Sequence, residues 1–402
     1  MPATSPLKRP RLLVLTTTFP RWADDHEPGF VFELCRRLRD FEVHVIAPHA
    51  KGAADHEIMD GVHVHRFRYA PAALETLAYN GGIAANLKRS RWKYLLLQGF
   101  LLGMFFRAFQ VARKADIHLI HAHWMIPTGL IGATLRELLP GDNRLLLTAH
   151  GGDVHSLRGK LFARLRRWVA GEADAVCVVG RNLLNSAREE AWQNPQVQVA
   201  AMGVDLRETF VPDAPRVAGK TLVFAGRLVS KKGVPHLLEA MRLLVDIEPE
   251  ARLLIAGHGP LQEMLKARSD SLGLEDHVRF LGKYSLGQLP QILRQGSITV
   301  LPFDTAEDGD QEGLGLTTVE AMGCGIPVIA GDVPAVHDVI EHERTGLLIN
   351  ARDHQALCDA ILRLWQQPDF AAELAAAARE QALEHFDWKV VADNHTKILQ
   401  QL

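Results

Sequence analysis

The chain has 402 residues, too many for one ordinary hydrophobic core, so two domains are expected. Its composition is globular, with 47% hydrophobic and 23% charged residues, and a net charge of -2 excludes the strong positive field of a nucleic-acid-binding protein. The four cysteines are far apart and form no Cys-x-x-Cys motif, so we expect buried thiols in a reducing cytoplasm and no disulfide.

The first half of the chain alternates short apolar runs with longer segments of helical periodicity. Basic residues precede the first run, but its four apolar residues are too few for the hydrophobic region of a signal peptide. Strands that alternate with helices indicate a parallel sheet made of β-α-β units. The runs predict β-strands at residues 12–15, 43–47, 117–121, 145–149 and 175–179.

A second series of the same kind follows a proline-rich interval at Pro212 and Pro215. It predicts strands at residues 222–225, 252–256, 278–281, 298–301 and 327–330. The fold class is therefore α/β, with two doubly wound Rossmann-like domains and a ligand bound between them at the carboxyl ends of the strands. The expected parts are a first domain at 1–205, a linker at 206–219, a second domain at 220–384 and a C-terminal helix at 385–402 that packs back on the first domain.

Cations gather at one strand-to-helix turn of the second half. In "LVFAGRLVSKKG", Gly226 and Arg227 come just after a strand, and Lys231, Lys232 and Gly233 open the next helix. Two or three cations at such a turn suit a phosphorylated ligand. A solvated charged surface is the alternative reading of such a cluster.

A second feature of this half is "EGLGLTTVEAMGCGIPVIA", in which glycines loosen a loop before a helix that begins near Leu316. The N-terminus of that helix directs unpaired N–H groups toward any anion nearby. Glu312 lies in the loop and Glu320 about one turn inside the helix, so they cannot be neighbours on one helical face. We expect them to hold two separate hydroxyl-bearing parts of one ligand.

A different carboxylate pair, Asp308 and Asp310, precedes this loop and suggests a divalent metal site. The two interpretations are incompatible. The pair of Asp308 and Asp310 implies a diphosphate bridged by a metal, whereas the pair of Glu312 and Glu320 implies a site without a metal. Arg227 and Lys232 already supply positive charge, so we favour the metal-free reading and expect no metal or other cofactor. The acidic run that ends at Asp310 then shapes a loop.

The motifs in their order and spacing resemble the retaining glycosyltransferases of family 4, which have the two-domain GT-B fold. The resemblance spans essentially the whole chain. It rests on "FPRWADDHEPGFVFELCRRL", "FEVHVIAPHA", "TAHGGDV", "GVD" at 203–205, "AGRLVSKKG", "IAGHGPL", "FLGKYS" and "EGLGLTTVEAMGCGIPVIAG".

The resemblance implies a nucleotide-sugar donor and a role for each motif residue. It implies that Arg227 and Lys232 neutralise the diphosphate of the donor. Glu312 would hold hydroxyls of the transferred sugar, and Glu320 the ribose. The remaining implied donor-site residues are Gly226, Tyr284 beside the base, Gly29 in the first glycine-containing loop, His150 beside the reacting sugar, and the backbone N–H groups of the loop Gly313, Leu314, Gly315, Leu316 and Thr317.

The implied reaction moves a hexose to a glycan or lipid-linked acceptor with retention of configuration, in synthesis of cell-envelope or exopolysaccharide. Cations and a helix N-terminus would stabilise the leaving diphosphate electrostatically. A nucleophilic Glu312, as in retaining glycosidases, is the lesser alternative. A GT-B epimerase or sugar phosphorylase and a non-catalytic nucleotide-sugar-binding subunit are the other classes that stay open.

Two basic and apolar segments in the first half suggest contact with an anionic membrane. Residues 76–115 contain seven basic and no acidic residues around "YLLLQGFLLGMFF", a run too short for a membrane span of about 20 residues. In "LRGKLFARLRRWVA" an apolar face opposes Arg158, Lys160, Arg164 and Arg167. Inward-facing helices are the alternative. We expect a cytoplasmic protein, at the inner face of the plasma membrane if these segments bind lipid.

Two further patterns are only weak indications of a function. His63 with His65, and His121 with His123, could each share a strand face and bind a metal, but the sequence shows no third ligand. "IAGHGPLQ" has Gln262 where a dinucleotide fingerprint requires glycine, which argues against a dehydrogenase.

Overall fold

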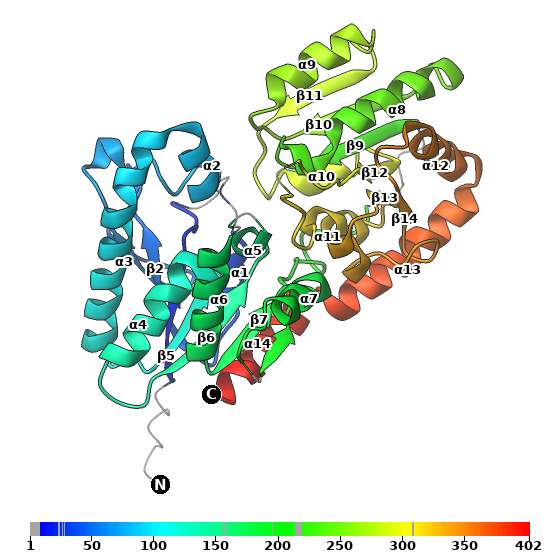
Figure 1. Ribbon diagram of the computed structural model, residues 1–402. Helices are drawn as coiled ribbons and strands as arrows, with labels where there is room; N and C mark the ends of the chain where they lie inside the picture. Colours follow the sequence, from blue (N-terminus) through cyan, green and yellow to red (C-terminus); the bar gives the residue numbers. More distant parts are fainter. Residues whose placement is uncertain are drawn as a thin grey trace. The chain divides into compact units, whose positions relative to one another are not determined.

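The computed structural model describes residues 9–22, 25, 27, 29–155, 157, 159–194, 196–213, 219–307 and 309–402. This described part divides into two compact units (Figure 1). Unit 1 contains the chain up to Val179, residues 184–200 and residues 391–402. Unit 2 contains residues 180–183 and 201–390.

Unit 1 is built on a sheet that has eight strands within the described residues, in the order β3-β4-β2-β1-β5-β6-β7-β8. Neighbouring strands are parallel except β3 and β4. The strands are β1 (Arg11–Leu15), β2 (Glu42–Pro48), β3 (His56–Met59), β4 (Val62–Phe67), β5 (Leu119–His123), β6 (Arg144–Ala149), β7 (Ala175–Val178) and β8 (Val197–Val199).

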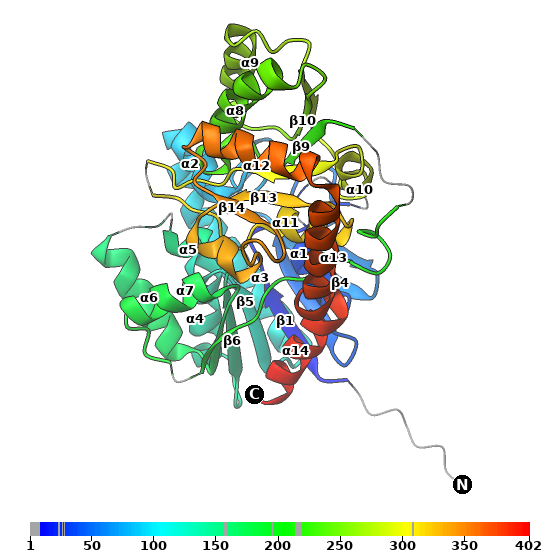
Figure 2. The same cartoon turned by 90° about the vertical axis from the view of Figure 1, so that its right-hand side faces the viewer.

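Helices cover both faces of this sheet. In Figure 1, α3, α4 and α6 lie side by side over one face, and Figure 2 shows α14 on the other side. Because both faces are covered, the central strands are largely apolar, and residues 12–15 of β1 are fully buried. The helices are α1 (Phe30–Cys35), α2 (Gly82–Arg89), α3 (Tyr94–Lys114), α4 (Leu130–Leu138), α5 (Gly152–His155) and α6 (Lys160–Glu172). Helices α7 (Arg181–Glu189) and α14 (Trp388–Gln400) have their first three residues in unit 2 and the rest in unit 1.

Unit 2 is built on a parallel sheet with six strands among the described residues, in the order β11-β10-β9-β12-β13-β14. Its strands are β9 (Thr221–Ala225), β10 (Arg252–Ala256), β11 (Val278–Gly282), β12 (Ile298–Leu301), β13 (Val328–Gly331) and β14 (Leu347–Ile349). Its helices are α8 (Val234–Ile247), α9 (Gln262–Ser271), α10 (Leu289–Leu293), α11 (Leu316–Gly323), α12 (His354–Gln366) and α13 (Pro368–His385). Each unit therefore has the doubly wound, Rossmann-like arrangement expected from the sequence.

Helix α3 is longer than its apolar run suggested. It has 21 residues, and an 18-residue stretch within residues 91–114 has a mean hydropathy of 1.5, so by length and composition this helix could cross a membrane. The expectation that this segment is too short to span a bilayer is therefore wrong. One face of α3 packs through Phe100, Met104 and Ala108 in the core, while Leu102 and Phe106 are exposed.

Helix α6 differs from the expected amphipathic pattern. Arg166 is buried and pairs with Glu190, and Val169 is buried, whereas the apolar side chains of Leu161 and Trp168 are exposed. The outward face of α6 is therefore mixed, apolar and basic together. Arg158, one of the expected cations, lies outside the described residues.

Candidate functional site

The turn after β9 brings its backbone close to neighbouring strands. Gly226 directly follows β9, and its N–H donates to the carbonyl oxygen of Ala256 at 3.0 Å. Gly233, the N-cap of α8, has a left-handed φ of 65°, and a Cβ there would lie 1.7 Å from the carbonyl oxygen of Pro302. Only glycine fits a position with both properties. Arg227 is half-buried in this turn.

Lys232 lies at the centre of the interactions in this region. Its Nζ is 2.6 Å from Oε2 of Glu312, and the two side chains are only 13% and 14% exposed. The ammonium also lies 4.7 Å from the ring centre of Phe303, a cation–π contact. Although burial opposes ionisation, the cations Lys232 and Lys231 lower the pKa of Glu312 to about 2. Glu312 is therefore an ionised carboxylate at neutral pH.

Lys231 fixes the loop that leads to Glu312. Its Nζ lies 3.2 Å from Oδ1 of Asp310 and donates to the carbonyl oxygen of Gln311 at 3.0 Å. Asp310 thus pairs with a lysine. Asp308, the other member of the suggested metal pair, lies outside the described residues. Within the part of the chain that is described, His, Cys, Asp and Glu side chains form no group of three or more with metal-site geometry.

The glycine-containing loop positions the N-terminus of α11. Gly315 is the N-cap with φ of 78°, a left-handed conformation that glycine adopts most easily, and α11 begins at Leu316. Leu314 is buried, while Gly313, Leu316 and Thr317 are half-buried. The first N–H groups of α11 therefore begin a few residues after Glu312 in the chain, as expected from the sequence.

Glu320 and Tyr284 lie close enough to interact electrostatically. Burial raises the pKa of Glu320 to about 7, although nearby Lys232 and a hydrogen bond with Thr317 act against the rise. Burial also raises the pKa of Tyr284 above its ordinary value, with Glu320 adding to the effect. The structure thus brings Lys232, Glu312, Glu320 and Tyr284 into one electrostatic neighbourhood of unit 2.

The two remaining expected residues lie in unit 1. His150 follows β6, and its ring is 5.1 Å from Phe30 and 4.9 Å from Trp124, centre to centre. Gly29 immediately precedes Phe30 as the N-cap of α1. Its φ of -94° is open to any residue, and a Cβ there would meet only Pro20, at 3.8 Å. Neither its φ nor the space around it therefore requires glycine at position 29.

Sequence reasoning missed the residue that holds the His150 loop in place. Asp153 is buried, and its carboxylate accepts hydrogen bonds from the backbone N–H groups of Met125 (2.6 Å), His150 (3.2 Å) and Gly151 (3.1 Å). Asp153 thus joins the segments that follow β5 and β6. Burial raises the pKa of Asp153, and the three N–H donors oppose that rise. The aspartate in "HGGD" was the available sequence signal, but its partners could not be read from it.

The histidine pairs considered as metal ligands form two clusters. His63 and His65 of β4 meet His44 and His56 from the neighbouring strands, and His44 Nδ1 lies 3.1 Å from His65 Nε2. The rings of His44 and His65 are stacked, with an interplanar angle of 9°. Further histidines therefore do lie beside the pair, in contrast to the sequence-based reading. Nδ1 of His44 and Nε2 of His65 face each other at hydrogen-bond distance, and the described residues contain no group of three or more side chains that could hold a metal ion.

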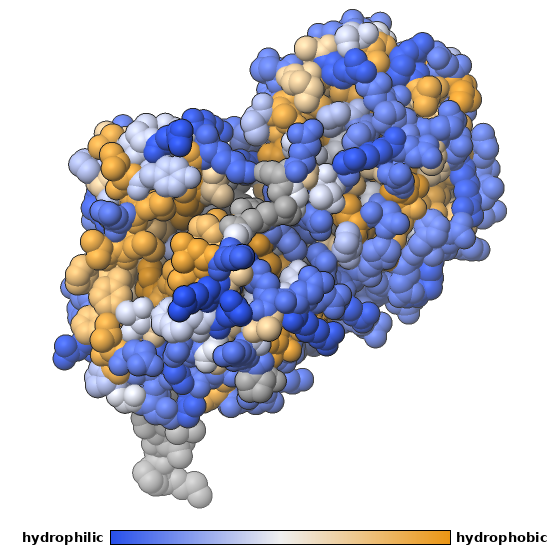
Figure 3. Space-filling model, in the orientation of Figure 1, coloured by the Kyte–Doolittle hydropathy of each residue, from blue (hydrophilic) through white to orange (hydrophobic). Residues whose placement is uncertain are grey.

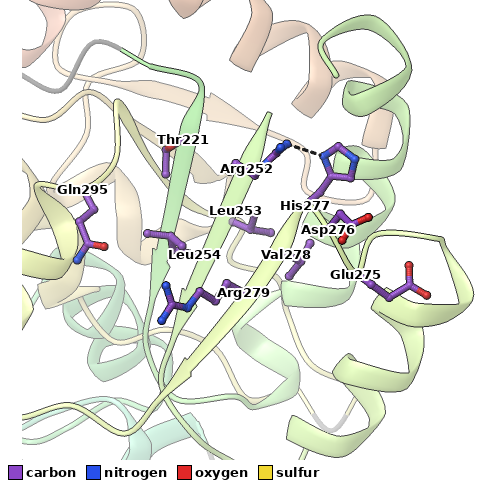
Figure 4. Close-up of a pocket in the computed structure, with 10 residues that line it drawn as sticks. All are labelled: Thr221, Arg252, Leu253, Leu254, Glu275, Asp276, His277, Val278, Arg279 and Gln295. Carbon is purple, nitrogen blue, oxygen red and sulfur yellow. Dashed lines mark hydrogen bonds between the residues drawn. The ribbon is translucent and has the colours of Figure 1, made fainter. Parts of the chain in front are cut away.

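A surface hollow of about 610 Å³ in unit 2 is unrelated to these residues (Figure 4). It is lined by Thr221, Arg252 and Val278, the first residues of β9, β10 and β11. Figure 4 shows the guanidinium of Arg252 directed at His277, its partner at 3.0 Å. The turn that holds Gly226 and Lys232 is at the opposite, carboxyl end of β9, where ligands bind in doubly wound sheets.

Comparisons with known proteins match both halves of the chain. Residues 30–208 match the family described as "Glycosyltransferase Family 4", and residues 208–381 match "Glycosyl transferases group 1". The chain is 27% identical to the GDP-mannose-dependent alpha-(1-6)-phosphatidylinositol monomannoside mannosyltransferase of Mycolicibacterium smegmatis, over 94% of this chain and 95% of that protein. It is 31% identical to the phosphatidyl-myo-inositol mannosyltransferase of Mycobacterium leprae, over 70% of this chain and 73% of that protein.

A solved structure shares the fold. The sucrose-phosphate synthase from Thermosynechococcus elongatus has a TM-score of 0.80 and 22% sequence identity, with 98% of this chain and 99% of that chain covered. Its similarity extends over both Rossmann-like units, which is the composition of the GT-B fold. From the matches of both halves and from this shared fold, we conclude that the chain is a glycosyltransferase with the GT-B fold and belongs to family 4.

Proposed function

We propose that this glycosyltransferase moves a hexose from a nucleotide-diphosphate sugar to a glycan or lipid-linked acceptor, with retention of configuration and without a metal ion. The observation that carries the proposal is the buried ion pair between Lys232 and Glu312 beside the turn after β9. The pair holds a cation in the turn between β9 and α8, with the carboxylate of Glu312 directly against it, and we propose that this carboxylate binds the transferred sugar.

The leaving diphosphate would be stabilised by charge alone. An ammonium group has three N–H donors, so Lys232 can keep its contact with Glu312 and still donate to phosphate oxygens. Arg227 adds a guanidinium that can bind phosphate in a bidentate manner. The N-terminus of α11, from Leu314 to Thr317, adds backbone N–H groups. These groups stabilise the negative charge that develops when the bond from sugar to phosphate breaks.

Retention would follow from attack on the face from which the diphosphate leaves. The acceptor hydroxyl attacks the anomeric carbon, the bond to the phosphate oxygen breaks, and a phosphate oxygen of the leaving group takes the hydroxyl proton. Glu312, whose pKa of about 2 keeps it ionised, holds sugar hydroxyls in this proposal. The lesser alternative is that Glu312 attacks the sugar and forms a covalent intermediate.

The other expected residues would bind the rest of the donor. Glu320 accepts hydrogen bonds from the ribose hydroxyls, and the backbone near Tyr284 lies beside the base. Gly226 lets the backbone of the turn approach the phosphates. Gly29 and His150 of unit 1 would lie beside the phosphates and the reacting sugar.

The relatives suggest the classes of donor and acceptor. The Mycolicibacterium relative is named for GDP-mannose and for a phosphatidylinositol monomannoside. We therefore propose a nucleotide-sugar donor of that kind, GDP-mannose first, and an acceptor that is lipid-linked or part of a cell-envelope or exopolysaccharide glycan.

A membrane location is part of the proposal. The outward face of α3 is apolar, with Leu95, Leu102 and Phe106 exposed by 81%, 56% and 62%. Figure 3 shows apolar side chains gathered over this side of unit 1. Exposed Arg91 and Arg113 lie near the two ends of the helix, and no acidic residue occurs between residues 76 and 115. An anionic bilayer complements such a surface, so we propose a cytoplasmic enzyme bound at the inner face of the plasma membrane.

The direct test is incubation with a panel of nucleotide sugars and acceptors, followed by mass spectrometry of products. The proposal expects a free nucleoside diphosphate together with a product heavier than the acceptor by one hexose, and proton NMR should show the anomeric configuration of the donor in the new bond. Product with inverted configuration would contradict retention.

Two other outcomes would point to the alternative classes. An isomerised sugar formed with water, or a sugar phosphate formed with inorganic phosphate, in the absence of a saccharide acceptor would indicate an epimerase or a phosphorylase with the same diphosphate site. Tight donor binding with no turnover on any acceptor would indicate a nucleotide-sugar-binding subunit.

A further inference from the structure

Four histidines of unit 1 form a row that leads inward from His150. Nε2 of His150 lies 3.0 Å from Nδ1 of His123. The ring of His123 lies 4.2 Å from that of His121, which in turn lies 6.2 Å from His395 of α14, centre to centre. His121, His123 and His395 are fully buried. This row has no part in the function proposed above except through His150.

The proton positions on the two inner rings follow from their partners. Nδ1 of His395 lies 2.9 Å from the carbonyl oxygen of Val391. A carbonyl only accepts, so this nitrogen carries the proton and Nε2 is bare. Nε2 of His121 lies 2.8 Å from the hydroxyl of Thr148, and Nδ1 of His121 has no partner among the described residues. A proton on Nε2 avoids a buried N–H without an acceptor.

The tautomer of His123 follows from its partners in the same way. Its Nε2 is buried and has no hydrogen-bond partner in the described part of the chain. A proton on that nitrogen would be a buried N–H without an acceptor, which is rare in folded proteins. The proton therefore belongs on Nδ1 of His123, which donates it to Nε2 of His150. His150 then carries its own proton on Nδ1.

The rings of His123 and His150 are both neutral near pH 7, as these proton positions require. Burial lowers the pKa of His150 to about 3, and that of His123 well below its ordinary value. Neutral His150 then has one donor nitrogen, and its other nitrogen already accepts a hydrogen bond from His123. It is therefore not a general base near neutral pH.

The backbone beside His123 is strained, which is a second and independent observation. Trp124 has φ of 74° in a non-glycine residue. Its N–H donates to the carbonyl oxygen of Thr148 at 2.7 Å, and the hydroxyl of Thr128 donates to the carbonyl oxygens of His123 and Trp124. Such strain persists only where surrounding contacts enforce it, and it is frequent at functional sites.

We propose that His123 is a positioning residue that holds His150 in the tautomer protonated at Nδ1, so that His150 presents a hydrogen-bond donor to an oxygen of the sugar. The proposal rests on the role proposed for His150 beside the reacting sugar. It assigns His150 the function of a neutral donor, and it explains why a second histidine stands at the end of β5.

Amide side chains provide a matched pair of variants. The amide of asparagine can occupy the position of Nδ1 of a histidine, whereas that of glutamine reaches the position of Nε2. His123→Asn therefore keeps a donor for His150, and His123→Gln does not. We expect His123→Asn to retain kcat within about threefold and His123→Gln to lose at least about tenfold in kcat, with little change in KM for the donor.

Nitrogen-15 NMR of the histidine rings tests the tautomer without any activity measurement. The proposal expects the proton of His150 on Nδ1 in the wild-type protein and in His123→Asn, and a mixture of tautomers in His123→Gln. His121→Gln, which preserves the contact with Thr148, is the control and should leave the His150 signals unchanged. A proton on Nε2 of His150 in the wild type, or identical His150 tautomers in the two His123 variants, would overturn the inference.

Activity of His150→Ala separates this inference from the function on which it rests. Unchanged transfer by His150→Ala would remove His150 from the proposed reaction, whatever its tautomer. Loss of transfer in His150→Ala together with full activity in His123→Gln would overturn the positioning role of His123 alone.

Discussion

Glu312 and Glu320 are the same type of residue, but their surroundings give them opposite protonation behaviour. Lys232 and Lys231 hold the pKa of Glu312 at about 2, whereas burial raises that of Glu320 to about 7. Glu312 is therefore charged at every physiological pH, and Glu320 titrates near neutrality. Glu312 therefore suits the role of an acceptor for sugar hydroxyls at every such pH, whereas the charge of Glu320 depends on the ligand that binds beside it.

Donor binding should consequently depend on pH through Glu320. A carboxylate accepts hydrogen bonds from ribose hydroxyls better than a carboxylic acid does, so donor affinity should rise as the pH rises through about 7. For a single group of this pKa, the gain between pH 6 and pH 8 is at most about tenfold. Isothermal titration calorimetry of donor binding at several pH values measures it, and near pH 7 binding should release protons.

Glu320→Gln should remove this pH dependence and weaken binding at pH 8. Glu263→Gln, at an exposed position of α9, is the matched control and should behave as the wild type. A flat pH profile in the wild type, or an unchanged slope in Glu320→Gln, would be inconsistent with a ribose contact by Glu320.

At this scale the sequence predicts residues whose partners are close by in a motif. Lys232, Glu312 and the N-terminus of α11 were identified because glycines and cations surround them. The contact of Asp153 with Met125 and that of His123 with His150 were not identified, since these partners lie 28 and 27 residues apart in the chain. Only the pairing of β5 with β6 brings these residues together.

At the scale of elements, the entry into α8 depends on a close approach between two backbones. Gly233 and Gly273 have nearly the same φ, 65° and 67°, but a Cβ at Gly233 would lie 1.7 Å from Pro302 O, whereas one at Gly273 would meet nothing within 4 Å. Gly273→Ala should cost about 1 kcal/mol for the left-handed conformation alone. Gly233→Ala should cost clearly more, roughly 3 kcal/mol or above.

Thermal unfolding monitored by circular dichroism compares the two variants. Because the two positions differ in the available space and have nearly the same left-handed φ, the difference between the variants reports mainly on the contact with Pro302. Equal shifts in Tm would show that the turn relaxes freely, and the backbone of the cation-bearing turn would then be less fixed than the structure indicates.

Helix α3 supports a prediction about lipid binding. Sedimentation with anionic vesicles at low salt should capture the protein, and neutral vesicles or high salt should release it. The double variant Leu102→Asp, Phe106→Asp places charges on the outward apolar face and should weaken binding at least about tenfold. Ile247→Asp, at a 53% exposed position of unit 2, is the control and should bind normally. If the vesicles captured the wild type and the double variant to the same extent, the outward face of α3 would not be the membrane-binding surface.

The strands illustrate what the sequence can predict about elements. All ten expected strands are present, with β5 shifted from residues 117–121 to Leu119–His123. The strands that were missed are β3, β4, β8 and β14. Among them, β4 reads "VHVHRF", in which histidine alternates with valine, and β8 and β14 have only three residues each. Such segments lack the continuous apolar run of a strand that is buried on both faces.

For the whole molecule, the repeated β-α-β pattern was sufficient to predict two Rossmann-like units, because covered parallel sheets require apolar strands at regular intervals. The family followed from motifs in both halves. The choice of sugar, base and acceptor could not be predicted in this way. It depends on individual side chains around the ligand, and the spacing of motifs does not encode their placement.

The central claim is that positive charge from the protein stabilises the leaving diphosphate without a metal ion. The most direct measurement is the rate of nucleotide release from the identified donor and acceptor in the presence of EDTA, for the wild type, Lys232→Ala and the surface control Lys266→Ala. The account predicts full activity of the wild type and of Lys266→Ala in EDTA, and a loss of about a hundredfold or more in Lys232→Ala. Loss of wild-type activity in EDTA, or unchanged activity in Lys232→Ala, would contradict it.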